Sequence, residues 1–328
     1  MRQWITKGAP RAAIILATAL AVSGFVGDKP ECIAPANPGG GWDFTCRTVG
    51  RLLHELKIVD RPVQVTNMPG AVGAVAFAHV AENRSKDRSL IVASSSVGMT
   101  QIAQNKYPGD ADKMRWLAMM GFDAGVVLVK ADSPYKTVGD LMNALKADPN
   151  AAVTGGSSSA GGYDHLRLLL LARAAGIETA NLRKIRWVQF EGGTDAVTQM
   201  LGGHLQVVST DLGEISGFVE SGQVRVLAVM TAERLEAPFD KLPTAREQGL
   251  DVVGVNWRGF YTGGGVSDAD YNAMVEGLKR LYDSSEWKET ARKSGLQPSW
   301  IGGREFEGFV RKSIADLRSL SKDIGVIK

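Results

Sequence analysis

A glycine-rich loop between an expected strand and an expected helix is the feature that most constrains this chain. Residues 31–47 read E-C-I-A-P-A-N-P-G-G-G-W-D-F-T-C-R. They predict a buried strand at residues 32–35, a loop through residue 41 and a helix that opens at residues 42–43. Consecutive glycines allow close approach of a ligand to the backbone, and a helix N-terminus offers free N–H groups at the positive end of its dipole. The stretch indicates an anion-binding site for a phosphate or a carboxylate, with a ligand-free βα turn as the alternative.

The N-terminus has the pattern of a cleavable signal peptide. Arg2, Lys7 and Arg11 precede an apolar run at residues 12–22, and small residues follow it. We predict a signal peptide over residues 1–27, because the apolar run is short for a stable membrane span; a single anchor is the alternative. Residues 1–27 hold three basic and no acidic residues, so the formal charge of +3 belongs to this segment. The balanced remainder gives no support for binding to nucleic acid or to a membrane surface.

The two cysteines flank the glycine loop. Cys32 lies in the expected first strand and Cys46 in the first turn of the expected helix. Exported proteins meet an oxidising compartment, so we predict a disulfide between them, with two unrelated buried thiols as the alternative. The bridge would close a loop of about 15 residues and stabilise the fold by roughly 3 kcal/mol in the chain-entropy model. The spacing is not that of a redox or zinc site.

Strand and helix patterns alternate along the whole chain, which predicts an α/β fold with helices on both faces of a parallel or mixed sheet. Strands are expected at residues 61–66, 89–93, 116–122, 126–130, 152–154, 184–190, 207–210, 224–229 and 257–262. Helices are expected at residues 42–56, 73–82, 138–147, 268–283, 286–294 and 304–320, and two more end at residues 175 and 201. Loops of small polar residues follow the strands that end near residues 35, 67, 93, 154 and 189. Ligands bind outside the carboxyl ends of strands in such sheets, so these loops predict a cleft.

Motifs for catalysis or cofactor binding do not occur. The glycines at 39–41 are not a dinucleotide fingerprint because position 44 is Phe, and residues 156–160 fail the G-x-S-x-G pattern. Asp43, Asp195 and Asp211 could form an acid–base set, but Asp in a first helical turn is more often a cap or a dipole partner. The histidines are expected to be solvent-facing or capping: His54, His79, His165 and His204. We therefore predict no catalytic residue, no cofactor and no metal.

Several stretches resemble one family. N-P-G-G-G-W-D at residues 37–43 and N-M-P-G-A-V-G at residues 67–73 resemble the solute-binding proteins of tripartite tricarboxylate transporters, which are also called Bug proteins. Further matching stretches lie at residues 155–165, 190–196, 242–244 and 256–260. The resemblance covers essentially the whole mature chain. The Glu-Cys…Cys-Arg frame around the first loop is similar to the tricarboxylate, citrate-type branch.

The resemblance implies a periplasmic-binding-protein (Venus flytrap) architecture, in which two α/β domains joined by crossing strands enclose a ligand cleft. We expect residues 28–123 with 252–328 to form one domain and residues 124–251 the other. The implied function is to capture a di- or tricarboxylate in the periplasm and to deliver it, chemically unchanged, to inner-membrane transporter subunits. The protein is expected to act as a monomer. The alternatives are an exported α/β enzyme acting on a carboxylate and a sensory receptor that presents the ligand to a signalling protein.

The family grips a ligand carboxylate with the loops that correspond to residues 37–43 and 191–195, mainly through backbone N–H groups and ordered waters. Asp43 and Asp195 are then expected to point away from the anion or to hold a water or a backbone amide in place. Arg258 departs from many members, which have an uncharged residue there, so it is either an extra charged contact or an exposed side chain. The predicted ligand-binding residues are Asn37, Pro38, Gly39, Gly40, Gly41, Trp42, Asp43, Ser94, Ser95, Ser96, Ser157, Ser158, Ser159, Glu191, Gly192, Gly193, Thr194, Asp195, Asp211 and Arg258.

Overall fold

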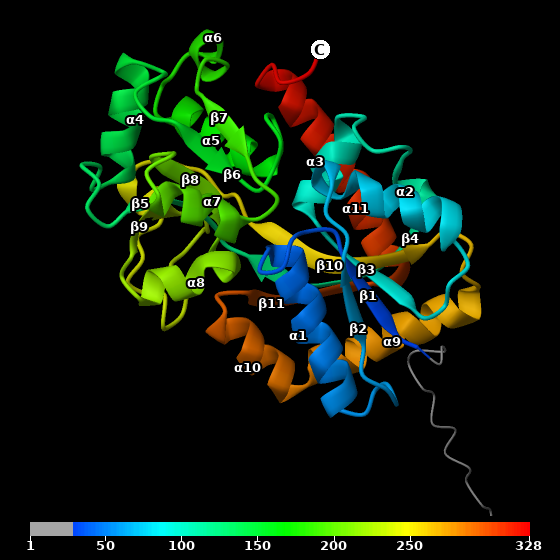
Figure 1. The fold of residues 1–328 in the computed structure, drawn as a ribbon. Coiled ribbons are helices and arrows are strands. Elements are labelled where there is room, and N and C mark those ends of the chain that lie inside the picture. Colours follow the sequence, from blue (N-terminus) through cyan, green and yellow to red (C-terminus); the bar gives the residue numbers. More distant parts are fainter. Residues whose placement is uncertain (1–28) are drawn as a thin grey trace, which may run out of the picture.

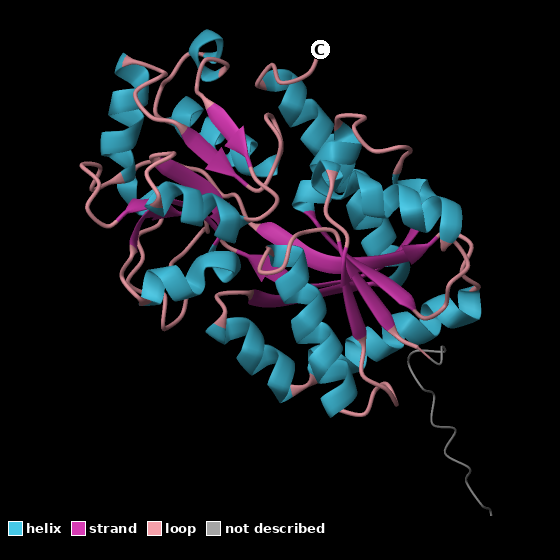
Figure 2. Ribbon diagram, in the orientation of Figure 1, coloured by secondary structure: helices cyan, strands magenta, loops and turns pink. Residues whose placement is uncertain are grey.

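The computed structural model describes residues 29–328, so the predicted signal peptide lies outside the described residues. The described chain forms two α/β lobes, each built on one β-sheet with helices on both faces (Figures 1 and 2). We call the lobe with the six-stranded sheet lobe A and the lobe with the five-stranded sheet lobe B. This arrangement confirms the predicted two-domain α/β architecture. Within residues 29–328, no helix has both the length and the apolar character needed to cross a membrane.

Lobe A has a mixed sheet. Its strand order is β11 (Gln297–Gly302), β4 (Met114–Asp123), β10 (Asn256–Gly263), β3 (Leu90–Ser95), β1 (Glu31–Ala34) and β2 (Gln64–Asn67). Strand β1 runs parallel to β2 and β3, whereas β10 is antiparallel to β3 and β4, and β11 is antiparallel to β4. One face packs on α1 (Gly41–Glu55), α9 (Asp268–Asp283) and α10 (Ser285–Lys293), the other on α2 (Ala74–Asn83), α3 (Ser96–Ala103) and α11 (Gly303–Asp323). Because successive side chains alternate between faces, Cys32 and Ala34 join the first core and Ile33 joins the second.

Lobe B repeats the plan with shorter strands. Its strand order is β7 (Trp187–Gln189), β6 (Thr154–Gly156), β8 (Val207–Asp211), β5 (Gly125–Lys130) and β9 (Val224–Val229). One face packs on α4 (Val138–Ala147), α5 (Tyr163–Ala174) and α6 (Thr179–Leu182), the other on α7 (Gly193–Leu201) and α8 (Leu212–Glu220). In β5, Val127 and Val129 face the first set of helices, and Val126 and Leu128 face the second.

The chain passes between the lobes three times. Strand β4 continues into β5 through the single residue Ala124, and the segment after β9 returns to lobe A at β10. After α11, the chain comes back toward lobe B, where Ile324 joins the core and Leu320 packs against it. In Figure 1 the C-terminal end of α11 accordingly points toward lobe B. These crossings bring the ends of β4 and β8 and the beginning of β10 to the junction between the lobes.

Some elements differ from the sequence-based expectations. Strand β11 lies where no strand was expected, and it is a half-buried edge strand that contains Pro298, so it lacks a clear alternating pattern. Helices α3 and α8 follow β3 and β8 directly, where only turns were expected. Helix α8 contains Gly213 and Gly217, which weaken the local helical signal. The strands expected at residues 61–66 and 184–190 are shorter in the structure.

Candidate functional site

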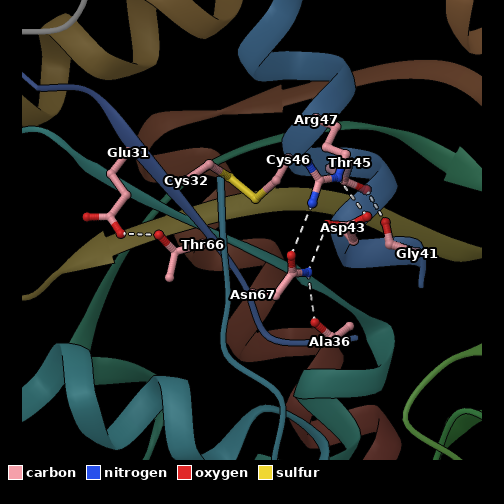
Figure 3. Close-up of a disulfide and its surroundings, with 10 residues drawn as sticks. All are labelled: Glu31, Cys32, Ala36, Gly41, Asp43, Thr45, Cys46, Arg47, Thr66 and Asn67. Atoms are coloured by element: carbon pink, nitrogen blue, oxygen red, sulfur yellow. Dashed lines mark hydrogen bonds and ion pairs between the residues drawn. A yellow bond between two sulfur atoms is a disulfide. The ribbon is translucent and has the colours of Figure 1, made fainter. Parts of the chain in front are cut away.

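A disulfide fixes the glycine loop to the sheet. Cys32 of β1 and Cys46 of α1 are joined, with their Cα atoms 5.7 Å apart (Figure 3). Both residues are fully buried. The bridge ties the first strand to the first helix on either side of the loop, so the predicted pairing is confirmed.

Asp43 organises the same loop from inside it. Its Oδ2 accepts a hydrogen bond from the N–H of Gly39 at 2.9 Å. The same oxygen accepts one from Nε of Arg47 at 2.9 Å, and Oδ1 accepts one from Nδ2 of Asn67 at 2.8 Å (Figure 3). Burial alone would raise the pKa of Asp43, but the hydrogen bonds from Arg47, Gly39 and Asn67 outweigh it and hold that pKa below its ordinary value. Gly39 has φ +87°, a conformation that favours glycine. Asp43 thus holds a backbone amide of the loop, as expected.

Polar loops of the two lobes contact each other on both sides of the junction. On one side, Asn37 Nδ2 donates to Asp195 Oδ2 at 3.3 Å, and Thr194 Oγ1 donates to the carbonyl of Gly39 at 2.9 Å. On the other side, Gln101 of α3 donates from Nε2 to Ser159 Oγ at 3.2 Å. The loops at the carboxyl ends of strands from both sheets therefore enclose the space between them.

A small cavity of about 20 Å³, which has room for about one water molecule, lies between these loops. Six of its lining residues were predicted from the sequence: Gly41, Trp42, Ser157, Glu191, Gly192 and Arg258. Three were not: Ala36, Val97 and Glu214. The other predicted residues lie outside this lining: Asn37, Pro38, Gly39, Gly40, Asp43, Ser94, Ser95, Ser96, Ser158, Ser159, Gly193, Thr194, Asp195 and Asp211.

Several predicted hydroxyl groups bind other parts of the protein. Ser95 Oγ accepts the N–H of Val97 at 3.2 Å and thereby caps α3, and it also accepts Nε1 of Trp42. Ser158 Oγ accepts the N–H of Asp164 at 3.0 Å in the first turn of α5. Ser157 lines the cavity, and its Oγ donates to Asp164 Oδ2 at 2.6 Å. Most of these serines thus order the helix starts around the cavity.

Two helices begin at the cavity without a side-chain cap. Gly40 is the N-cap of α1 and Gly192 is the N-cap of α7, and neither can supply a capping side chain. The N–H of Gly193 donates instead to Glu214 Oε2 at 2.6 Å. A carboxylate from α8 therefore occupies the positive end of α7, where anions are stabilised.

Arg258 is buried and ion-paired. Its side chain is 3% exposed, and Nη2 lies 2.9 Å from Asp123 Oδ2, 2.8 Å from Asp211 Oδ2 and 3.1 Å from Glu214 Oε1. The interpretation of Arg258 as an exposed side chain is therefore wrong. Its guanidinium group lines the cavity, but its charge is already paired with three carboxylates. The pairs with Asp211 and Glu214 join β10 of lobe A to β8 and α8 of lobe B.

A second buried arginine extends this network. Arg167 of α5 pairs with Asp164 and, at 2.6 Å from Nη1, with Asp211 Oδ1. The network thus contains two cations and four carboxyl groups: Arg167, Arg258, Asp123, Asp164, Asp211 and Glu214. Burial raises the pKa of Asp123 to about 6 and that of Glu214 to about 7. The attraction of Arg258 offsets this only partly, and repulsion from Asp211 adds to it.

Sequence reasoning missed four members of the network: Asp123, Asp164, Arg167 and Glu214. Asp123 is the last residue of β4, and Glu214 comes three residues after the end of β8. The rule that polar residues after strands converge at one sheet edge could have identified both. No local sequence pattern indicated the ion pairs of the two arginines. Except for Asp164, which is close to Arg167 in the sequence, their partners are 44 to 135 residues away.

Comparison with known proteins identifies the family. The family model described as "Tripartite tricarboxylate transporter family receptor" matches residues 50–326. BugT of Bordetella pertussis is 26% identical over 303 residues, covering 90% of this chain and 89% of BugT. A Cupriavidus necator protein encoded in the gbd 5′ region is 24% identical over 292 residues, covering 88% and 85%.

Solved structures share the fold. The periplasmic binding protein BugD superposes with a TM-score of 0.81 at 18% identity, covering 92% of this chain and 99% of BugD. An R. palustris protein with adipate, Rpa4515, gives 0.81 at 20% identity, covering 90% and 97%. MatC of Rhodopseudomonas palustris with bound malate gives 0.78 at 17% identity, covering 89% and 98%. With a family model that spans most of its length, this chain belongs to the tripartite tricarboxylate transporter receptor family.

Proposed function

We propose that this chain is a periplasmic receptor that captures a di- or tricarboxylate of the citrate type and delivers it to the membrane subunits of a tripartite tricarboxylate transporter. It is exported by a cleavable signal peptide at residues 1–27 and acts as a monomer. It binds the acid without chemical change. Family membership and the relatives with malate and adipate support this proposal.

The observation that carries the proposal is the convergence on one cavity of two helix N-termini whose N-cap residues have no side chain. Gly41 of α1 and Gly192, the N-cap of α7, both line it, one from each lobe. Each such helix end stabilises an anion by about 0.3–1 kcal/mol at a surface and by up to about 2 kcal/mol when partly buried. A ligand with carboxylates at both ends would engage both helices at once.

The test is calorimetry on the mature protein with malate, citrate and adipate, and with the neutral diamide of malic acid as the matched control. We expect saturable binding of at least one acid with one site per chain, and no binding of the diamide. Failure of all three acids to bind at millimolar concentration would contradict the proposed function. Equal binding of the acid and its diamide would show that recognition does not depend on the carboxylates.

We further propose that residues 28–123 with 252–328 and residues 124–251 move as two domains that close on the ligand. Contacts such as Thr194 to the carbonyl of Gly39 join the domains only when the loops are together. A ligand that touches both domains then shifts the equilibrium toward the closed form. Small-angle scattering should show a smaller radius of gyration with a saturating acid. An unchanged radius with a tightly bound ligand would refute the closure.

A further inference from the structure

One carboxylate of the protein occupies a position suited to a ligand carboxylate. Glu214 Oε2 accepts the N–H of Gly193 at the start of α7, and Oε1 lies 3.1 Å from Nη2 of Arg258. A Cβ atom on Gly41 would collide with Oε1 of Glu214, so the carboxylate also lies directly against the start of α1. The side chain of Glu214 is 3% exposed. It therefore sits between the two helix N-termini that face the cavity.

Glu214 differs from the other two partners of Arg258. Asp123 and Asp211 do not line the cavity, whereas Glu214 does. Glu214 also lines a larger groove on the outer side, together with Gly39 and Phe218. Glu214 thus borders both the cavity and the groove, and the groove offers space for its side chain.

A second donor at the same position lacks a partner. Thr210 is 0% exposed, and its Oγ1 has no hydrogen-bond partner within the described part of the chain. A Cβ atom on Gly193 would collide with this hydroxyl as well as with Glu214 Oε2, so the hydroxyl faces the start of α7. A buried hydroxyl without a hydrogen-bond partner is costly, and a differently placed carboxylate could accept a hydrogen bond from it.

We propose that Glu214 is an internal competitor of the ligand: a ligand carboxylate replaces the Glu214 carboxylate on the N–H of Gly193 and on Arg258, so Glu214 determines affinity and charge preference at this position. The inference rests on the proposed function. Competition of this kind raises specificity at the expense of affinity, because a neutral group cannot replace the lost contacts of Glu214.

The first test compares ligand affinities in Glu214→Gln and Glu214→Ala. The matched control is Glu220→Gln, an exposed glutamate at the end of the same helix. Calorimetry with malate, citrate and adipate should show that both Glu214 variants bind the preferred acid at least tenfold more tightly than wild type, whereas Glu220→Gln is unchanged. Unchanged or weaker binding in the isosteric Glu214→Gln variant would overturn the inference.

The second test does not need the natural ligand. Acetate carries one carboxylate and matches in size the CH2–COO− group that Glu214→Ala removes. We expect 50 mM acetate to raise the melting temperature of Glu214→Ala by several degrees more than that of wild type or Glu220→Gln. An equal shift in all three proteins would overturn the inference. If acetate rescues Glu214→Ala but no acid of the panel binds any variant, the carboxylate position stands and the proposed function fails.

Discussion

Removal of the charge of Arg258 should destabilise the protein strongly and in a pH-dependent way. In Arg258→Met, three buried carboxyl groups would surround an apolar side chain: Asp123, Asp211 and Glu214. Loss of one partner of a buried ion pair costs about 3–5 kcal/mol, because an uncompensated charge stays buried. We expect a loss of this size in the free energy of unfolding at pH 8.

The pH dependence follows from the attraction that the variant loses. In the wild type, Arg258 lowers the pKa of Asp123 and of Glu214, which nevertheless stand at about 6 and about 7. Without Arg258 both pKa values rise further. The native variant then holds protons that the unfolded chain has already released, so its stability falls as pH rises, and this fall extends above pH 7.

Urea unfolding at pH 5.5 and pH 8.0 measures this effect. The difference between wild type and Arg258→Met should be larger at pH 8.0 by at least about 1.4 kcal/mol, which corresponds to one pKa unit. The control is Arg311→Met, which removes an exposed pair with Asp112 and should cost about 0–1 kcal/mol at either pH. A loss below about 1 kcal/mol at pH 8.0, or the same loss at both pH values, would refute the role of the network.

Three further predictions concern the glycine loop. Cys46→Ser should lower the free energy of unfolding by about 3 kcal/mol, as for a closed loop of about 15 residues, and a loss below about 1 kcal/mol in urea would contradict this. Gly41→Ala should weaken acid binding in calorimetry more than Gly40→Ala does. The added Cβ at position 41 would collide with Arg258 and Glu214, whereas the Cβ at position 40 would lie 3.2 Å from the Cβ of Ala36. The reverse order of affinities would be evidence against the site. Asp43→Asn should be less stable than wild type at neutral pH, and the difference should shrink as pH falls below about 4, because the pKa of Asp43 lies below its ordinary 3.8. A difference that is constant with pH would contradict that role.

The regular elements were predictable where local signals agreed. Helix α4 begins and ends as predicted, because Thr137 caps it together with Asp140 and its apolar residues follow one face. Helix α9 was also predicted with its observed bounds, and it begins after the capping side chain of Ser267. Edge strand β11 could not be predicted, because its residues are all half-buried and a strand of this kind is specified by its partner β4.

The site was predictable only in part, because its two components leave different traces in a sequence. Glycines at helix starts are local signals, and they identified Gly41 and Gly192, which line the cavity. Ion pairs between distant segments leave no local signal, so the sequence identified Arg258 and Asp211 as site residues but neither their pairing nor the other two partners of Arg258. Asp123 and Glu214 could be assigned to Arg258 only after the crossing of β4 and β10 between the lobes was known.

Helices α1 and α7, which begin at the cavity, start differently from helices α4, α9 and α10. Helices α4, α9 and α10, whose residues do not line the cavity, begin with Thr137, Ser267 and Ser284, whose side chains accept N–H groups of the first turn. Helices α1 and α7 begin with glycine, which is only a few tenths of a kcal/mol worse as an N-cap but leaves N–H donors free for an outside acceptor. At α7 that acceptor is the carboxylate of Glu214, which belongs to the same lobe. The same carboxylate also pairs with Arg258. The uncapped helices and the buried arginine thus act on the same anion position, and a carboxylate that takes this position gains from both.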